Sequence, residues 1–111
     1  MPSSVIAGNE KVMQARLSDA AFFYEQDQKK SLASFYPLLE TTCFHAQLGS
    51  VAEQLHRMEH VLLAWASPLS LTPALIKRAL FLSKCDLMTG MVGEFPTLEG
   101  IMGAYYAAAG G

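Results

Sequence analysis

The chain of 111 residues is long enough for one domain, and it has neither an apolar run of membrane-spanning length nor a secretion signal, which predicts a cytoplasmic protein. Its hydrophobic fraction is 51% and its charged fraction 16%, against about 25% charged residues in average soluble domains, which indicates apolar surface left for a partner. The net charge of −2 argues against a free-standing nucleic-acid-binding module, and two separated cysteines argue against a zinc or redox motif.

The first predicted element is a helix from Asn9, which can cap it, to about Lys29. We expect residues 1–8 to be a disordered lead or a segment added for expression, and residues 9–111 to form a single helical domain. Two stripes run along this helix. The apolar stripe contains Met13, Leu17, Ala20 and Tyr24, and the mixed stripe beside it contains Arg16, Asp19, Phe23 and Asp27. The mixed stripe either faces a partner or only steadies the helix through local contacts.

A short second helix and a longer third helix are predicted next. Ser31 can cap the short one, and Pro37 must either sit in its first turn or end it. A boundary at Gly49 opens the third helix, which Ser67 and Pro68 stop. Its apolar face has the spacing typical of packing against other helices and contains Val51, Leu55, Met58, Leu62 and Trp65.

Thr72 followed by Pro73 predicts the start of a fourth helix, which we expect to run to about Gly90. Apolar residues cover most of its circumference, so it is expected in the middle of the domain. Helix geometry places Asp86 on the side of Leu75, Ala79 and Leu82, where a buried carboxylate must find a donor. Phe95 and Pro96 mark a turn before a last helix that contains Ile101, Met102, Tyr105 and Tyr106. No strand with convincing alternation is found.

Three short patterns resemble functional motifs but are better explained without a binding site. The run from His56 to His60 matches the H-x-x-E-H zinc pattern, but its histidines lie away from the apolar face and too few residues remain for a third ligand and a cleft. The glycines between Gly90 and Gly103 follow no strand and fit no phosphate-binding fingerprint. Isolated basic side chains such as Lys29 and Lys30 either contact RNA phosphates or, more often, only solubilise a face.

Three stretches carry a family resemblance that spans nearly the whole chain. They are GNEKVMQARLSDAAFFYEQD (8–27), FHAQLGSVAEQLHRME (44–59) and RALFLSKCDLMTGMVGEFPTLEGIMGAYYA (78–107). Together they resemble the beta subunit of the bacterial tetrameric glycyl-tRNA synthetase. The sequence departs from the family pattern at Ser31, where proline is usual, and at Glu99, where glutamine is common. The resemblance implies a fragment of a much longer, multidomain subunit.

The resemblance also implies an all-α fold, a compact helical domain that resembles a degenerate HD-domain fold. Active HD phosphohydrolases bind metal through a histidine, an adjacent His-Asp pair and a later aspartate. Here His45 matches the first histidine, whereas Cys85 and Asp86 take the place of the pair and no aspartate follows them. The resemblance therefore implies an incomplete metal site and no catalytic residue in this chain.

The same resemblance defines the expected partners and cofactors. In this family glycine activation, with ATP and magnesium, belongs to the alpha subunit, while the beta subunit is the main tRNA-binding part. We therefore expect an inactive module of an ATP-dependent glycine–tRNA ligase, without a cofactor of its own. Its expected partners are tRNA(Gly), the alpha subunit and the remaining beta-subunit domains. No association with a membrane is expected. The candidate tRNA contacts are Arg16, Lys77, Arg78 and Lys84.

Further candidates have structural or interface roles: Asp19, Phe23, Asp86, Glu94, Phe95 and Pro96. With the metal absent, the charge of Asp86 is expected to be held by Arg16 or His45. Two other functions stay open. One is a residual metal-dependent phosphohydrolase built on His45, Cys85 and Asp86, and the other is an interaction scaffold that touches no RNA.

Overall fold

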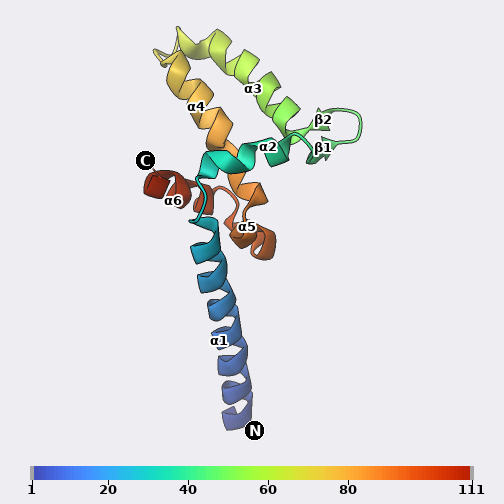
Figure 1. The fold of residues 1–111 in the computed structure, drawn as a ribbon, viewed down its shortest axis with the longest axis vertical. Helices are drawn as coiled ribbons and strands as arrows, with labels where there is room; N and C mark the ends of the chain where they lie inside the picture. The colour runs from blue at the N-terminus through green and yellow to red at the C-terminus, as the bar shows by residue number, and fades with distance from the viewer. Residues whose placement is uncertain (1, 111) are drawn as a thin grey trace.

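The computed structural model describes residues 2–110, which are mostly helical (Figure 1). The α-helices of this part are α1 (Pro2–Asp27), α2 (Tyr36–Leu39), α3 (Val51–Ala66), α4 (Pro73–Ser83), α5 (Gly90–Glu94) and α6 (Ile101–Gly110). Its 3₁₀-helices are η1 (Leu32–Phe35), η2 (Cys85–Met88) and η3 (Pro96–Leu98). The predicted all-α class is confirmed. The prediction of no strand is wrong in one place, because β1 (Cys43–His45) and β2 (Gly49–Ser50) form a small antiparallel hairpin.

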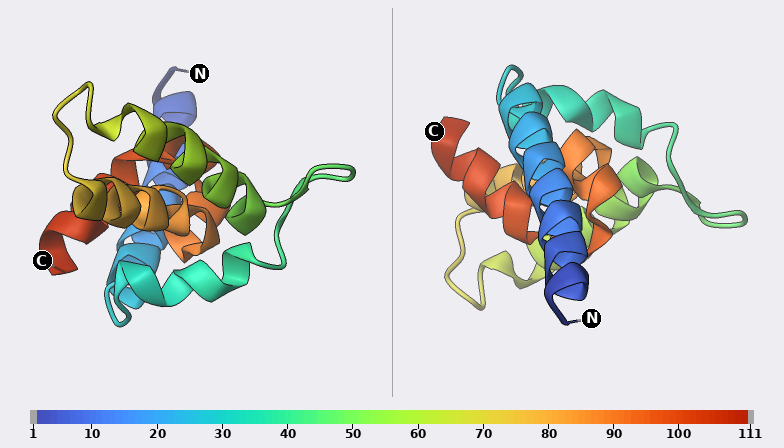
Figure 2. Two further views of the ribbon diagram at one scale, coloured as in Figure 1. Left: turned by 90° about the horizontal axis from the view of Figure 1, so that it is seen from above. Right: turned by 90° about the horizontal axis from the view of Figure 1, so that it is seen from below.

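The molecule is elongated because α1 extends away from a body formed by the other helices (Figure 1). Its principal extents are 63 × 34 × 26 Å and its radius of gyration is 18.2 Å, against about 13 Å for a compact domain of about 100 residues. A helix of the length of α1 measures about 39 Å. Figure 2 shows the shorter helices arranged around one end of α1.

Helix α1 begins earlier than the sequence predicts. It starts at Pro2 and not at Asn9, so the expected cap at Asn9 is wrong. The lead expected over residues 1–8 is helical from Pro2 onward, and Met1 lies outside the described residues. The helix ends at Asp27, close to the predicted end.

The two stripes of α1 differ in how much of each is buried. Met13 and Leu17 of the apolar stripe are 58% and 61% exposed. The mixed stripe, by contrast, includes the half-buried Phe23 and the buried Asp27, and α1 packs against α5. A Cβ on Gly90 of α5 would lie 2.7 Å from Cδ1 of Phe23, so the glycine permits this close approach. The interpretation of this edge as a partner-facing surface is therefore wrong at its Asp27 end.

The segment after α1 forms η1 and then α2. Pro37 lies in the first turn of α2, which is one of the two predicted alternatives. Ser31 precedes η1 but makes no side-chain capping bond. Leu39 at the end of α2 is fully buried, so this short segment contributes directly to the core.

A local capping signal lies at the start of α3. Ser50 and Glu53 form a capping box at the start of α3, next to the predicted boundary at Gly49. The stop at Ser67 is confirmed. The predicted apolar face is only partly buried, since Met58 and Trp65 are 37% and 57% exposed.

The fourth helix starts as predicted but ends earlier. Thr72 precedes Pro73 at its start, whereas its last residue is Ser83 and not Gly90. The chain then forms η2 and begins α5 at Gly90, with the Thr89 side chain accepting a bond from the Val92 N–H. The expected central position of α4 is also wrong, because only Ile76 and Leu80 of this helix are buried. Two breaks therefore replace the single long helix.

The core lies among the short helices rather than along α1. Leu39, Leu55, Leu80, Met91 and Met102 are buried there, and each comes from a different helix from α2 to α6. The buried residue of α1 is Asp27. The attachment of α1 to the body therefore centres on a polar residue.

Candidate functional site

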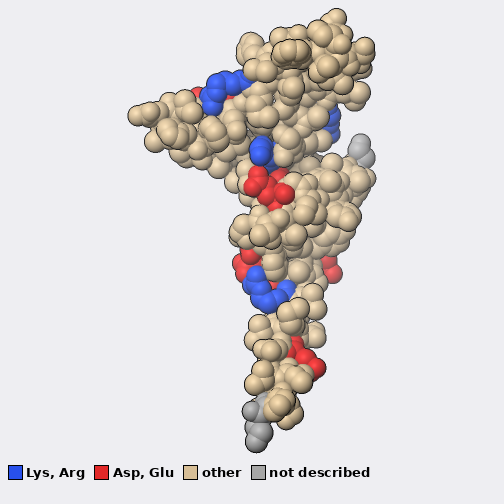
Figure 3. Space-filling view, turned by 180° about the vertical axis from the view of Figure 1, so that it is seen from behind, with Lys and Arg blue, Asp and Glu red and all other residues tan. Residues whose placement is uncertain are grey.

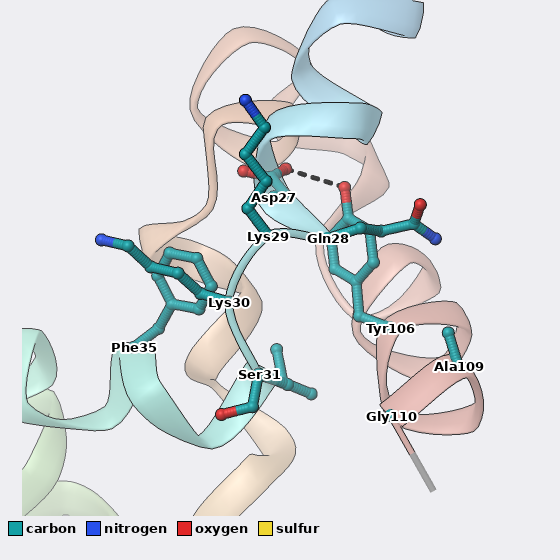
Figure 4. Close-up of a pocket in the computed structure, with 10 residues that line it drawn as sticks. Asp27, Gln28, Lys29, Lys30, Ser31, Phe35, Tyr106, Ala109 and Gly110 are labelled. Atoms are coloured by element: carbon teal, nitrogen blue, oxygen red, sulfur yellow. Dashed lines mark hydrogen bonds between the residues drawn. The ribbon is translucent and has the colours of Figure 1, made fainter.

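Asp27 joins the end of α1 to α5 and α6. Its Oδ1 accepts a hydrogen bond from the Gly90 N–H at 2.8 Å, and its Oδ2 accepts from the Met91 N–H at 2.9 Å. Oδ2 also accepts from the Tyr106 hydroxyl at 2.7 Å, as Figure 4 shows. The first N–H groups of a helix have no intrahelical partner, so the carboxylate satisfies the beginning of α5. Asp27 was part of the mixed stripe but was not among the predicted site residues.

Tyr106 is the second member of this cluster. It is 7% exposed, and its ring lies 5.9 Å from that of Tyr24 on α1, between centroids. Burial raises the pKa of Tyr106, and so does the hydrogen bond to the Asp27 carboxylate. The phenol therefore stays protonated and donates to Asp27 at neutral pH.

Asp86 performs a similar task at the beginning of α6. It is completely buried in η2, and its Oδ2 accepts hydrogen bonds from the backbone N–H groups of Gly100 and Gly103. The predicted partners are wrong, because Arg16 pairs with Glu94 of α5 and His45 lies in the exposed β1 strand. The expected burial of Asp86 is confirmed, although the helix geometry used to infer it is not.

The packing around Asp86 leaves little room. A Cβ on Gly103 would lie 2.9 Å from Oδ2 of Asp86, so this position favours glycine. The other carboxylate oxygen, Oδ1, is buried without a hydrogen-bond partner among the described residues. The Thr89 hydroxyl donates to the Asp86 carbonyl at 2.6 Å, which links η2 to the start of α5.

The three side chains that the predicted HD relationship matches to metal ligands do not converge. Cys85 and Asp86 are buried in η2, whereas the exposed His45 uses its Nδ1 to accept a bond from the Gln47 N–H at 3.1 Å within its own turn. Residues 2–110 contain no group of three or more histidine, cysteine, aspartate or glutamate side chains placed to hold a metal ion. The HD relationship itself stays a prediction.

The H-x-x-E-H run lies on α3. His56 and His60 are exposed, as expected, and Glu59 is half-buried. His56 and Glu59 line a cavity with residues of α2 and α4, which the sequence pattern alone does not indicate.

Cys85 is predicted to be unreactive in the folded protein. Burial raises the pKa of its thiol to about 11; the Asp86 carboxylate raises it as well, and Arg78 acts in the opposite direction. Because the thiolate is the reactive form, native protein at pH 8 should take up iodoacetamide at the exposed Cys43 and not at Cys85. Peptide mass spectrometry should find one labelled cysteine in native protein and two in urea. Cys85 is also completely buried, so its labelling in native protein requires the fold to open.

A Cys43→Ser variant is the control for this experiment. It should take up almost no label in the native state at pH 8 and one label in urea. Native labelling of Cys85 at a rate similar to Cys43 would contradict the placement of Cys85 in the core.

The four candidate tRNA contacts fall into two groups. Arg16 lies 2.8 Å from Glu94, from Nη1 to Oε1, and Lys84 lies 3.3 Å from Glu99, from Nζ to Oε1. Lys77 and Arg78 are exposed on α4, and neither forms an ion pair within residues 2–110. The last two are thus better placed to contact an external phosphate.

Several of the candidate interface residues lie where α1 packs against α5, whereas Asp86 lies in η2. The Arg16 guanidinium lies 4.4 Å from the centroid of the Phe95 ring while it pairs with Glu94. Asp19 is exposed and lies 3.9 Å from Arg16, and Pro96 begins η3. This arrangement joins several candidates inside the chain, although most remain accessible.

Charged side chains are sparse on the face drawn in Figure 3. Blue and red groups are scattered there, and most of the surface is uncharged. Within residues 2–110, no helix is long and apolar enough to cross a membrane.

Comparison with known proteins gives a consistent family assignment. The family model described as "Glycyl-tRNA synthetase beta subunit" matches residues 1–111. The chain is 49% identical over 110 residues to the "Glycine--tRNA ligase beta subunit" of Neisseria meningitidis serogroup C (strain 053442), with 99% of this chain and 16% of the relative covered. It is 52% identical over 106 residues to the protein of the same name from Aeromonas salmonicida (strain A449), with 96% and 15% covered. It thus spans about 16% of the length of the first relative. The chain belongs to the glycyl-tRNA synthetase beta subunit family.

Proposed function

We propose that the chain is a non-catalytic helical module of the beta subunit of tetrameric glycyl-tRNA synthetase, which supports tRNA binding and subunit architecture during glycine attachment. The position of Asp86 carries the non-catalytic part of this proposal. This carboxylate is fully buried and holds the N–H groups of Gly100 and Gly103, so it is sequestered from any substrate. The side chain that the predicted HD relationship would match to a metal ligand thus stabilises the fold.

The surface of α1 supports an architectural role. Exposed apolar side chains run along this helix: Val5, Ile6, Val12, Met13 and Leu17. Extended apolar surface of this kind is typical of protein interfaces. The matched relatives are several times longer than this chain. We infer that the other beta-subunit domains or the alpha subunit cover α1.

Lys77 and Arg78 are the proposed tRNA contacts. Both are exposed on α4 and make no ion pair within the described part of the chain. The net charge of −2 limits the module to a few phosphate contacts, which predicts binding that is weak and sensitive to salt. We assign glycine activation, with its ATP and magnesium, to the alpha subunit. We expect the complex to be cytoplasmic.

Replacing Lys77 and Arg78 together by glutamine in the complete enzyme tests the tRNA role. We expect tRNA affinity to fall about tenfold near 0.1 M salt, because two phosphate contacts are lost. The slope of log K against log salt should shrink by about 1.5 to 2. Filter binding over a salt series measures both quantities.

A matched variant separates local contacts from overall charge. Lys29→Gln with Lys30→Gln removes the same charge from the exposed segment between α1 and η1. Glycine-dependent ATP–pyrophosphate exchange should be unchanged in both double variants. If the two variants weaken tRNA binding equally, or neither weakens it, the assignment to Lys77 and Arg78 is wrong.

A further inference from the structure

A cavity of about 340 Å³ lies among α2, α3 and α4. One part of its lining consists of two aromatic rings, Tyr36 and Phe81. These rings stack on one another with centroids 4.2 Å apart and an interplanar angle of 18°. Both residues are half-buried, so the stacked pair is held by the fold and still borders the cavity. The stacking covers the facing side of each ring, so a planar ligand can lie only against an outer face of the pair.

Polar groups border the same cavity. His56 and Glu59 come from α3, and Lys77 comes from α4. Burial raises the pKa of Tyr36, and electrostatic interactions with Glu40, Cys85 and Glu59 raise it further. The Tyr36 hydroxyl is therefore a neutral donor at physiological pH. The cavity thus combines an aromatic wall with a cation, a carboxylate acceptor and hydrogen-bonding groups.

We propose that this cavity binds one unpaired nucleotide of an RNA strand. The base lies against the Tyr36 and Phe81 pair, since stacking on aromatic rings is the common way to hold an unpaired base. Lys77 contacts the adjoining phosphate, and Glu59 accepts an N–H from the edge of the base. This inference rests on the proposed function, because it places part of the RNA contact around Lys77 in a defined pocket.

The chemistry of the cavity favours a nucleotide over two other ligand classes. A purely apolar ligand would make no use of the exposed Lys77 or of the Glu59 carboxylate. A metal ion needs more ligands than the one histidine and one carboxylate that line the cavity. Paired bases in a duplex have both faces covered by their neighbours, so an unpaired base is the form that can use the aromatic pair.

Two RNA probes test this inference in the complete enzyme. One is a fluorescein-labelled single-stranded hexanucleotide, and the other is a strand of the same length whose six positions are abasic. We expect the strand with bases to bind roughly 5- to 150-fold tighter, which is the range for stacking of one base. Phe81→Leu should abolish this difference, while Lys77→Gln should weaken both strands.

Phe23→Leu is the matched control, because it makes the same substitution in a half-buried ring of α1 that does not line this cavity. The control should preserve the difference between the probes. A strand that contains 4-thiouridine should also crosslink, in the wild-type protein, to a peptide with Tyr36 or Phe81, a readout that does not depend on the folding of any variant.

Equal binding of the two strands, or a crosslink confined to other peptides, overturns the pocket. If the Lys77 and Arg78 double variant still weakens tRNA binding in that case, the proposed function stands without the pocket. If that variant also binds tRNA as tightly as the wild type, both the pocket and the proposed tRNA contact are wrong.

Discussion

Replacing Asp27 by alanine is expected to lower the free energy of unfolding of the 111-residue chain by about 3 to 5 kcal/mol. The substitution removes the acceptor of three hydrogen bonds and leaves the Gly90 and Met91 N–H groups and the Tyr106 hydroxyl without it. All three bonds join α1 to the body, so the attachment of the end of α1 to the body should also weaken. Urea unfolding followed by circular dichroism measures the first effect, and hydrogen exchange of α1 measures the second.

Two variants calibrate this result. Asp19→Ala removes the same charge from an exposed position on α1 and should change stability by less than about 0.5 kcal/mol. Tyr106→Phe removes one of the three bonds and should cost about 1 to 3 kcal/mol. If Asp27→Ala unfolds at the same urea concentration as Asp19→Ala, the carboxylate does not hold α1 to the body.

Helix starts were predictable where capping residues lie next to one another in the sequence. Thr72 and Pro73 mark α4, and the boundary at Gly49 lies next to the capping box of Ser50 and Glu53. These signals need no tertiary information. At α3 the Ser50 side chain accepts from the nearby Glu53 N–H, whereas Thr72 makes no side-chain capping bond and the signal for α4 is Pro73 in its first turn. The beginning of α1 carried a false signal of the same kind at Asn9.

The break after α4 was missed because apolar periodicity continues through it. Leu87 and Met88 extend the apolar pattern of α4, yet they belong to η2. Thr89 provides the signal that could have revealed the break, since its side chain accepts from the Val92 N–H at the start of α5. A threonine before a glycine is a weak signal on its own. In the structure the break also coincides with the complete burial of Asp86.

Nonlocal bonds explain why the candidate site was predicted only in part. A helix projection predicted the burial of Asp86 although the helix ends before it, and its donors lie 14 and 17 residues farther along the chain. Asp27 lies 63 residues from Gly90 and 79 from Tyr106. No periodicity encodes such separations, and backbone N–H donors leave no mark in the sequence. Long side chains such as Arg16 were therefore favoured over the backbone as partners.

The second large effect is expected at Asp86. Replacing it by alanine removes the acceptor of the Gly100 and Gly103 N–H groups and opens a gap where the side chain is completely buried. We expect the free energy of unfolding to fall by about 2 to 4 kcal/mol, because buried donors without a partner cost about 1 to 3 kcal/mol each. Asp86→Asn keeps one oxygen acceptor at nearly the same volume and should lose less. Urea unfolding compares the variants.

We expect the loss of stability to come from the structural role of the Asp86 carboxylate and not from the loss of a bound ion. Glu59→Ala on α3 removes the same charge from a half-buried carboxylate and should lower stability far less than Asp86→Ala. Gly103→Ala should also destabilise the chain, since its Cβ would lie 2.9 Å from Oδ2 of Asp86. If Asp86→Ala unfolds at the same urea concentration as the wild type while tRNA or subunit binding is lost, Asp86 is a contact residue. Equal stability of the two proteins would therefore contradict the structural role on which the non-catalytic proposal rests.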